Sequence, residues 1–356
     1  MSQRPRIYLD HAATTPILPA AKAAMLEAME RWANPSSPHA EGRAARAALE
    51  DARERIKRAL GWDGELIFTS GATEAIDIAM ARAKAGPRLV SAMEHPAVLR
   101  AGPDARLIAA LPDGQVDLSD LVSALAGTER PLVAVQAVNN ETGVIQPLDA
   151  VLAATRAGGG LLLADCAQSA GKLLLPEADL IILAAHKLGG PPGIGALLVR
   201  EAGMLAAVGG QEGGYRPGTG AVPQIMAFAA ACEADHAWVE RAASLRARLD
   251  QGIIEAGGEV IAQHSPRIAT IGAYRLPGVP GASQLMQFDL AGIAVSAGSA
   301  CSSGALKTSH VLLAMGMAEE AAREVVRISF GPETTAADID ALLEQWRKLA
   351  ARRATA

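Results

Sequence analysis

The sequence is poor in aromatic residues and in cysteine. Aromatic side chains make up 3% of its 356 residues and hydrophobic residues 50%, which predicts a large, mostly aliphatic core. The three cysteines, Cys166, Cys232 and Cys301, are too few and too scattered for a disulfide framework, and none belongs to a CxxC pair. A reducing cytoplasm is therefore the expected compartment.

The sequence also lacks a basic block and a long apolar run. Its formal net charge is -5, which argues against nucleic acid as the main partner, because phosphate binding needs clustered lysine and arginine. No apolar run reaches the roughly 18 to 20 residues of a membrane span. The opening residues, MSQRPRIYLDHAATT, lack the apolar stretch of a signal peptide. We expect no membrane contact and no direct nucleic-acid contact.

Short apolar runs alternate with helical patterns along most of the chain. The expected strands are Leu66–Thr69, Arg88–Ser91, Leu132–Gln136, Leu161–Ala164, Leu180–Leu183 and Ala196–Val199. The expected helices include Ala20–Arg31, Ala40–Leu60, Thr73–Lys84, Asp149–Ala157 and one long helix from about Val222 to Ala256. This alternation predicts an α/β fold with a mostly parallel sheet covered by helices.

The pattern changes near Gly257–Gly258, where we place a domain boundary. Beyond it, short strands mix with short helices. The expected strands are Ala269–Arg275 and Val325–Ser329, and the expected helices are Ser283–Leu290, Ser309–Leu313 and Ala336–Ala350. A smaller α+β domain is therefore expected to follow the first.

Several polar residues follow the expected strands, at the edge where α/β sheets bind ligands. A helix begins at Thr73 in FTSGATEA, and its free N–H groups suit a phosphate, although an ordinary capping turn accounts for the same residues. Asp165 is either a helix cap or the partner of a positively charged ring nitrogen. Lys187 is either a solvated lysine or, with a lowered pKa, an amine that condenses with an aldehyde. Together the three favour pyridoxal phosphate.

Three further residues have both a chemical and a structural interpretation. His95, in EHPAVL, suits ring stacking and proton transfer, or else caps a helix. Asn140 suits a hydrogen bond to a ring substituent, or else forms a turn. Cys301 lies among Gly, Ala and Ser, a composition that favours a nucleophile on an exposed loop. Cys232 has the apolar neighbours of a structural cysteine, and Cys166 is interpreted as packing among small residues.

Taken together, these motifs resemble the cysteine desulfurases of the NifS/IscS group, which are pyridoxal-phosphate-dependent enzymes related to class V aminotransferases. The resemblance runs almost end to end through YLDHAATTP, NPSSPH, FTSGATEA, EHPAVL, VNNETGVIQP, DCAQSAGK, AAHKLGGPPGIGAL, GGQEGGYRPGT, GSACSSGALKTSHVLLAMG and VRISFGPETT. It implies fold type I, with a mostly parallel seven-stranded sheet. It also implies a large cofactor-binding domain, 15–257, and a small domain made of 1–14 and 258–356 that carries the catalytic cysteine loop.

The resemblance also implies a role for each matching residue. Lys187 corresponds to the lysine bonded to the cofactor, and the glycines after it to residues that leave room for cofactor and substrate. The ring contacts correspond to His95, Asp165, Asn140 and Gln168; the phosphate contacts to Ala72, Thr73 and His186; and the substrate carboxylate contacts to Asn34 and Arg327. Thr219 corresponds to a threonine that reaches the phosphate of the other subunit, which implies a homodimer. Cys301 corresponds to the nucleophile that takes the sulfur.

The implied reaction removes sulfur from L-cysteine, releases L-alanine and leaves a persulfide on Cys301. The long segment from Cys301 to Leu312 resembles the extended loop of the IscS-like branch, which implies delivery to a docked sulfur-acceptor protein. Iron–sulfur assembly, tRNA thiolation and DNA sulfur modification are all open destinations. No resident metal is expected, with Cys301 considered as a transient iron–sulfur ligand shared with a scaffold partner.

The sequence departs from the family pattern just before the lysine. The family often has Ser-x-His-Lys, and Ala184 here lacks the hydroxyl that contacts the phosphate. The segment between Lys172 and Leu180 also looks shorter than usual. Three alternatives to the desulfurase are considered: an aminotransferase, a lyase for selenocysteine or cysteine sulfinate, and a sulfur scaffold without catalysis. The Cys301 loop argues against the first, and intact Lys187 and Asp165 argue against the last.

Overall fold

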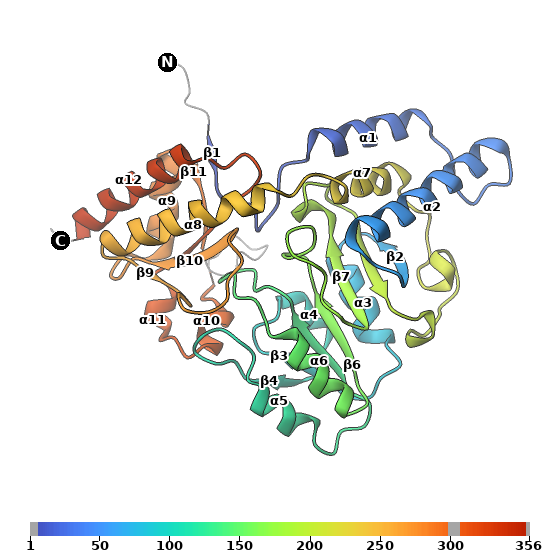
Figure 1. The fold of residues 1–356 in the computed structure, drawn as a ribbon, viewed down its shortest axis with the longest axis horizontal. Helices are drawn as coiled ribbons and strands as arrows, with labels where there is room; N and C mark the ends of the chain where they lie inside the picture. Colours follow the sequence, from blue (N-terminus) through green and yellow to red (C-terminus); the bar gives the residue numbers. More distant parts are fainter. Residues whose placement is uncertain (1–5, 298–306, 354–356) are drawn as a thin grey trace.

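A seven-stranded sheet is the largest layer of the protein (Figure 1). The computed structural model describes residues 6–297 and 307–353. In spatial order the strands are β2 (Glu65–Thr69), β8 (Gly195–Val199), β7 (Leu180–Ala184), β6 (Leu161–Asp165), β5 (Leu132–Gln136), β3 (Arg88–Ser91) and β4 (Arg106–Ile108). Only β8 runs against its neighbours, β2 and β7. The predicted α/β fold with a mostly parallel sheet is confirmed.

Helices cover both faces of this sheet. One face packs against α2 (Ala40–Leu60), α5 (Leu118–Leu125), α6 (Leu148–Ala157) and α7 (Val222–Cys232), and the other against α3 (Ala72–Arg82) and α4 (Pro96–Ala101). The N-terminal helix α1 (Pro19–Glu30) lies along α7 (Figure 1). Within residues 6–297 and 307–353, none of the helices combines the length and the apolar character that crossing a bilayer requires.

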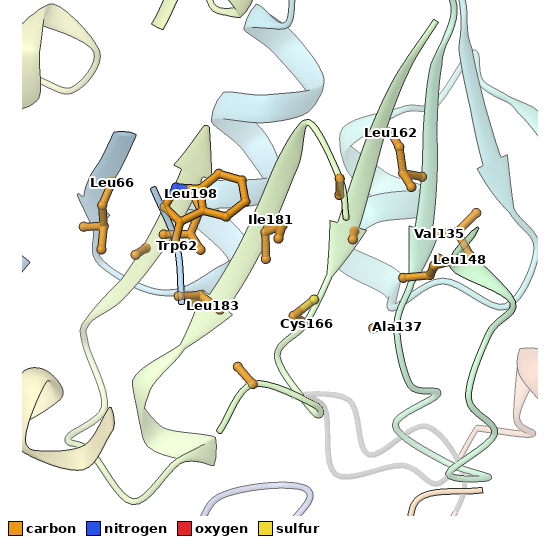
Figure 2. Close-up of a cluster of buried hydrophobic side chains, with 14 of the residues drawn as sticks. Trp62, Leu66, Val135, Ala137, Leu148, Leu162, Cys166, Ile181, Leu183 and Leu198 are labelled. Carbon is orange, nitrogen blue, oxygen red and sulfur yellow. The ribbon is translucent and has the colours of Figure 1, made fainter. Parts of the chain in front are cut away.

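The strands are apolar on both faces because both faces are covered. In β7, Leu180 and Ile182 join the core beneath α3, whereas Ile181 and Leu183 join the core on the opposite face. Figure 2 shows the second of these cores, in which Cys166 lies among aliphatic side chains from neighbouring strands. All five residues of β7 are buried. Burial on both sides fixes the strand, and therefore the position of the residues that follow it.

A second, antiparallel sheet lies beside the seven-stranded sheet and the helices that cover it (Figure 1). Its strands are, in spatial order, β12 (Ser296–Ala297), β13 (Val325–Ser329), β10 (Ile271–Arg275) and β9 (Glu259–Val260), and β1 (Ile7–Tyr8) pairs separately with β11 (Ile293–Ala294). The helices of this region are α8 (Trp238–Glu255), α9 (Gly281–Leu290), α10 (His310–Ala314), α11 (Glu319–Ala322) and α12 (Ala336–Arg353). Trp346 and Tyr274 are fully buried in its core. The division into 15–257 and the remainder stays a prediction.

The prediction of a single long helix from Val222 to Ala256 is wrong. The chain forms α7 and α8 instead, separated by residues 233–237. The Asp235 carboxylate accepts a hydrogen bond from the Ala237 N–H at 2.8 Å, which stabilises a turn in place of another helical turn. The break lets the chain pass from one core to the other, since α7 packs under the large sheet and α8 packs with α12.

Candidate active site

A pocket of about 490 Å³ opens where the parallel strands of the large sheet end. Most of the site residues predicted from the sequence line this pocket. They are Ala72, Thr73, His95, Asn140, Asp165, His186, Lys187 and Arg327. We call this space the active-site pocket. Of the other predicted site residues, Gln168, Asn34 and Thr219 do not line it, and Cys301 lies outside the described residues.

Lys187 ends a short 3-10 helix, Ala185–Lys187, that follows β7 directly. Among the described residues its Nζ has no hydrogen-bond or ion-pair partner. Burial lowers the pKa of Lys187 to about 8; the Asp165 charge opposes this change and the Arg327 charge adds to it. A larger fraction of the amine is therefore neutral near pH 7 than in an exposed lysine, which gives Nζ the lone pair of a nucleophile or base.

The glycines after Lys187 have two different surroundings. A Cβ atom on Gly189 would come within 2.5 Å of Leu18 Cγ, and the backbone there has a φ of +85°. Gly189 therefore serves a tight turn that packs against the chain before α1. Gly193 is the glycine of this turn that lines the pocket, and a Cβ atom there would meet nothing within 4 Å.

Asp165 is the last residue of β6, where its backbone pairs with Gln136 and Ile182 on the two neighbouring strands. One carboxylate oxygen, Oδ1, accepts a hydrogen bond from the Ala167 N–H at 2.9 Å. Both expected roles are therefore compatible, since this bond fixes the side chain locally and leaves Oδ2 for a ligand. β6 is the middle strand of the sheet, so the Asp165 charge lies at the edge where the strands end and the pocket opens.

His95 is the N-cap of α4 and also lines the pocket. Its Nδ1 accepts a hydrogen bond from the Ala97 N–H at 3.2 Å, so the neutral ring carries its proton on Nε2. Burial lowers the pKa of His95, the Lys187 charge lowers it further, and the Asp165 charge opposes both. A neutral ring of fixed orientation suits stacking against a flat ligand and proton transfer.

The start of α3 faces the pocket with Gly71, Ala72 and Thr73. The first N–H groups of a helix have no partner within the helix and favour an anion. Glu74 also lines the pocket, and its carboxylate accepts hydrogen bonds from the Ser70 N–H and from Arg216 Nε, the latter at 2.7 Å. Among the described residues nothing accepts a hydrogen bond from the N–H groups of Ala72 and Thr73, so these groups are available to a phosphate.

Arg327 reaches the pocket from β13 of the second sheet. Its Nη2 contacts Asp10 Oδ1 at 2.8 Å, and its Nη1 donates to the Asn140 carbonyl oxygen at 3.0 Å. The side chain is 11% exposed, and Nε is buried without a hydrogen-bond partner among the described residues. A guanidinium fixed at two points, with N–H groups remaining, suits a carboxylate ligand.

The structure does not bring Asn34 or Thr219 to the pocket of this chain. Asn34 is exposed, and its Oδ1 accepts the Ser36 N–H at 2.9 Å. Thr219 is exposed at the end of a loop that Glu212 anchors: its Oε2 contacts Arg53 Nη1 and accepts the Phe68 N–H, each at 2.8 Å. An anchored loop with an exposed threonine is compatible with contact to a second subunit.

Three residues near the pocket had no role assigned from the sequence. Arg100 and Glu141 line it, and Glu94 is buried beside His95. Burial raises the pKa of Glu94 well above its usual value, and the Asp165 charge adds to this effect. The one sequence signal for Glu94 was its position next to His95. That position does not show whether the Glu94 side chain faces the pocket, because neighbouring residues of a turn point in different directions.

With this geometry established, the chain can be compared with known proteins. The Aminotransferase class-V family matches residues 7–342, and the chain belongs to this family. It is 36% identical to a cysteine desulfurase of Gluconacetobacter diazotrophicus (95% of this chain, 92% of the relative) and 39% identical to one of Frankia sp. (94% and 88%). A NifS-like protein from Rickettsia africae is similar in structure, with a TM-score of 0.88, 28% identity and coverage of 97% and 99%. DndA from Streptomyces lividans is 33% identical with a TM-score of 0.72, covering 90% and 99%.

The class V family depends on pyridoxal phosphate, and the residues of the pocket fit this group. Lys187 offers an unpaired amine for its aldehyde, and the start of α3 offers N–H groups for its phosphate. Gln168 donates through Nε2 to the Ala12 carbonyl oxygen at 2.9 Å, while its buried Oε1 has no partner among the described residues. A ring hydroxyl would supply the missing donor. Gln168 does not line the pocket, and its role as a ring contact stays a prediction.

Proposed function

We propose that this protein is a cysteine desulfurase that transfers the sulfur of L-cysteine to Cys301 and releases L-alanine. The observation that carries the proposal is the convergence of Lys187, Asp165 and Arg327 on one pocket. These residues supply an amine, a partner for a cationic ring and a carboxylate site. The names of the curated relatives support L-cysteine as the substrate. We expect the enzyme to act in the cytoplasm.

Lys187 is the proposed attachment point of pyridoxal phosphate. Asp165 pairs with its ring nitrogen, His95 stacks on its ring, and Asn140 and Gln168 contact its ring substituents. Its phosphate binds to Ala72 and Thr73 at the start of α3 and to His186, with Thr219 reaching the site of the other subunit in a homodimer. When bound, the cofactor supplies a sink for the electron pair released at the α-carbon of the substrate.

The chain's own residues orient the substrate and move the protons. Arg327 binds the substrate carboxylate, as proposed also for Asn34, and thereby places the α-carbon. The neutral amine of Lys187 takes the α-proton on Nζ and later returns a proton to carbon. His95 moves a second proton through Nε2, because its Nδ1 is already an acceptor.

Cys301 is the proposed nucleophile. Its thiolate attacks the substrate sulfur, so that a sulfur–sulfur bond forms as the carbon–sulfur bond breaks and the carbon gains a proton. The product on the protein is a persulfide, which passes to an acceptor protein. Iron–sulfur clusters, thiolated tRNA and sulfur-modified DNA are candidate destinations for this sulfur.

The test of this proposal measures L-alanine and sulfide released from L-cysteine by the purified, cofactor-loaded protein with a reductant. Equal amounts of both products are expected. The Cys301→Ala variant should lose both products while the absorption band of the bound cofactor remains, because the cysteine is needed for sulfur transfer and not for cofactor binding. Cys232→Ala is a matched control, since Cys232 is buried in α7. Full sulfide release by Cys301→Ala would contradict the proposal.

Ala184 leads to a separate prediction about cofactor affinity. It ends β7, where the family often has a serine that contacts the phosphate. Ala184→Ser should therefore lower the dissociation constant for pyridoxal phosphate, since one hydrogen bond to a charged group is worth roughly 1.5–3 kcal/mol. The measurement is the dissociation constant for pyridoxal phosphate after stripping and titration. An unchanged constant would show that other groups already satisfy the phosphate.

A further inference from the structure

A second, smaller cavity also reaches Lys187. Its volume is about 70 Å³, and its lining includes Thr15, Lys172, Lys187, His236 and Trp238. We call it the rear chamber. Lys187 is the residue that lines both the rear chamber and the active-site pocket among the described residues. The chamber exceeds the roughly 10–15 Å³ that one water molecule needs, so it has room for water.

Lys172 is the second lysine of the rear chamber. Its Nζ donates to the Gln168 carbonyl oxygen at 3.2 Å, and no carboxylate among the described residues lies within ion-pair distance. Part of the side chain is accessible, yet enough protein surrounds the amine that burial, followed by the Lys187 charge, lowers the pKa of Lys172 to about 8. Burial brings the pKa of Lys187 to the same value. Each amine is therefore able both to take and to give a proton near neutral pH.

Two histidines near Lys172 have unpartnered nitrogen atoms. His236 Nε2, in the chamber wall, and His11 Nδ1 are both buried without a hydrogen-bond partner among the described residues. Burial, followed by the Lys172 charge, lowers the pKa of both rings, to about 4 in His11. Neutral rings with free nitrogen atoms are groups that water molecules satisfy, because an unmade buried hydrogen bond is costly.

The remaining charges around the two lysines come from two places, the chamber wall and the active-site pocket. Asp235, in the turn between α7 and α8, is a carboxylate of the chamber wall, and it already accepts the Ala237 N–H. Asp165 and Arg327 act on Lys187 from the active-site pocket, where His95 and His186 also lie. Within this set of neighbours, the Lys187 charge acts on Lys172.

The rear chamber adjoins a further cavity of about 250 Å³. The two share Thr15, Leu18 and Pro332 in their walls, and His11 lines the outer one. Among the described residues, none lines both this outer cavity and the active-site pocket, so the rear chamber borders a space that is separate from that pocket.

We propose that Lys172 exchanges a proton with Lys187 through water in the rear chamber, so that Lys187 can discharge the substrate proton away from the active-site pocket. The inference rests on the proposed function, in which Lys187 is the base. The Lys187 ammonium gives one proton to a chamber water, and that water gives one of its protons to the neutral Lys172 amine. No electrons move, and the reverse transfer restores both groups.

The first test reads the lysine pair without using activity. The full-length protein without bound cofactor, in which Lys187 has a free amine, is labelled with ¹³C at the lysine ε-carbon and titrated by NMR, and the Lys172 signal is assigned with Lys172→Met. The wild-type signal should titrate near pH 8, the value that burial and the Lys187 charge give Lys172. It should titrate at higher pH in Lys187→Met, because a neighbouring positive charge is gone. An ordinary lysine pKa in the wild type, or no change in Lys187→Met, would overturn the proposal.

The second test follows the substrate proton. With L-cysteine deuterated at the α-carbon, the fraction of deuterium retained in L-alanine reports how often Lys187 exchanges its proton before returning it. Lys172→Met and Lys172→Arg should both raise this fraction and lower kcat by roughly tenfold, since neither side chain gives and takes a proton near neutral pH. Lys348→Met, at an exposed ion pair with Glu344 on α12, is the control.

The arginine variant separates proton exchange from a purely electrostatic effect. Arginine keeps the positive charge, so wild-type retention in Lys172→Arg would mean that charge alone acts on Lys187 and would overturn the exchange. Wild-type retention in both variants would overturn it as well. If the wild type forms no L-alanine, the proposed function fails, and the NMR titration still decides whether the two lysines form a coupled pair.

Discussion

Replacing Lys187 with alanine is expected to lower the rate of L-alanine formation from L-cysteine by roughly a thousandfold, because one side chain is both the cofactor attachment and the base. The structure places no second amine in the wall of the active-site pocket among the described residues, since Lys172 lines only the rear chamber. Single-turnover assays with the cofactor-loaded variant measure the loss.

The control for this variant is Lys348→Ala. That lysine pairs with Glu344 on the surface of α12 and should be close to neutral for activity and stability. Cofactor content must be measured beside activity, because Lys187→Ala leaves Asp165, His95 and the start of α3 in place. A Lys187→Ala variant that holds its cofactor and still turns over at the wild-type rate would remove Lys187 from the mechanism.

The large sheet was predictable because its strands are short apolar runs with helical patterns between them. β5 and β13 match the expected ranges completely, as both are continuous apolar-rich segments of five residues. β4 was missed because it has three residues, two of them exposed, so neither periodicity nor hydropathy distinguishes it from a loop. The helix expected at 222–256 failed for the opposite reason, since both of its halves have helical patterns and the break depends on two different cores.

The residues of the active-site pocket were predictable to a larger extent than those of the rear chamber. Asp165 ends β6 and Lys187 comes three residues after β7, and these strands end at one edge of the sheet, so strand prediction alone brings the two residues together. Lys172 and His11 meet through tertiary packing of a loop onto the N-terminal segment, for which no local pattern exists. Lys172 stands in the predicted motif DCAQSAGK, yet the motif itself does not show which of its side chains turns toward Lys187.

Arg327→Ala is expected to reduce kcat/KM for L-cysteine by roughly a hundredfold or more, with most of the loss in KM, since removing one partner of a buried charge pair costs about 2–5 kcal/mol. Asp10 already neutralises part of this guanidinium, but the arginine presents N–H groups beyond those that Asp10 and Asn140 use. Arg327→Lys should recover only part of the loss, because an ammonium group cannot make the forked contact to a carboxylate. Steady-state assays over a range of L-cysteine concentrations measure both constants.

A substrate role and a structural role for Arg327 predict different results. Arg275 on β10 is a matched control, since two carboxylates bind it at a site outside the pocket, and Arg275→Ala should leave KM unchanged. Arg327 also lowers the pKa of Lys187, so Arg327→Ala should raise that pKa, because a nearby positive charge disfavours the ammonium form. The activity limb that depends on neutral Lys187 then moves to higher pH. A raised KM with this shift identifies a charge that acts on both substrate and base, whereas a lowered melting temperature with unchanged KM would leave Arg327 as a link between the two sheets.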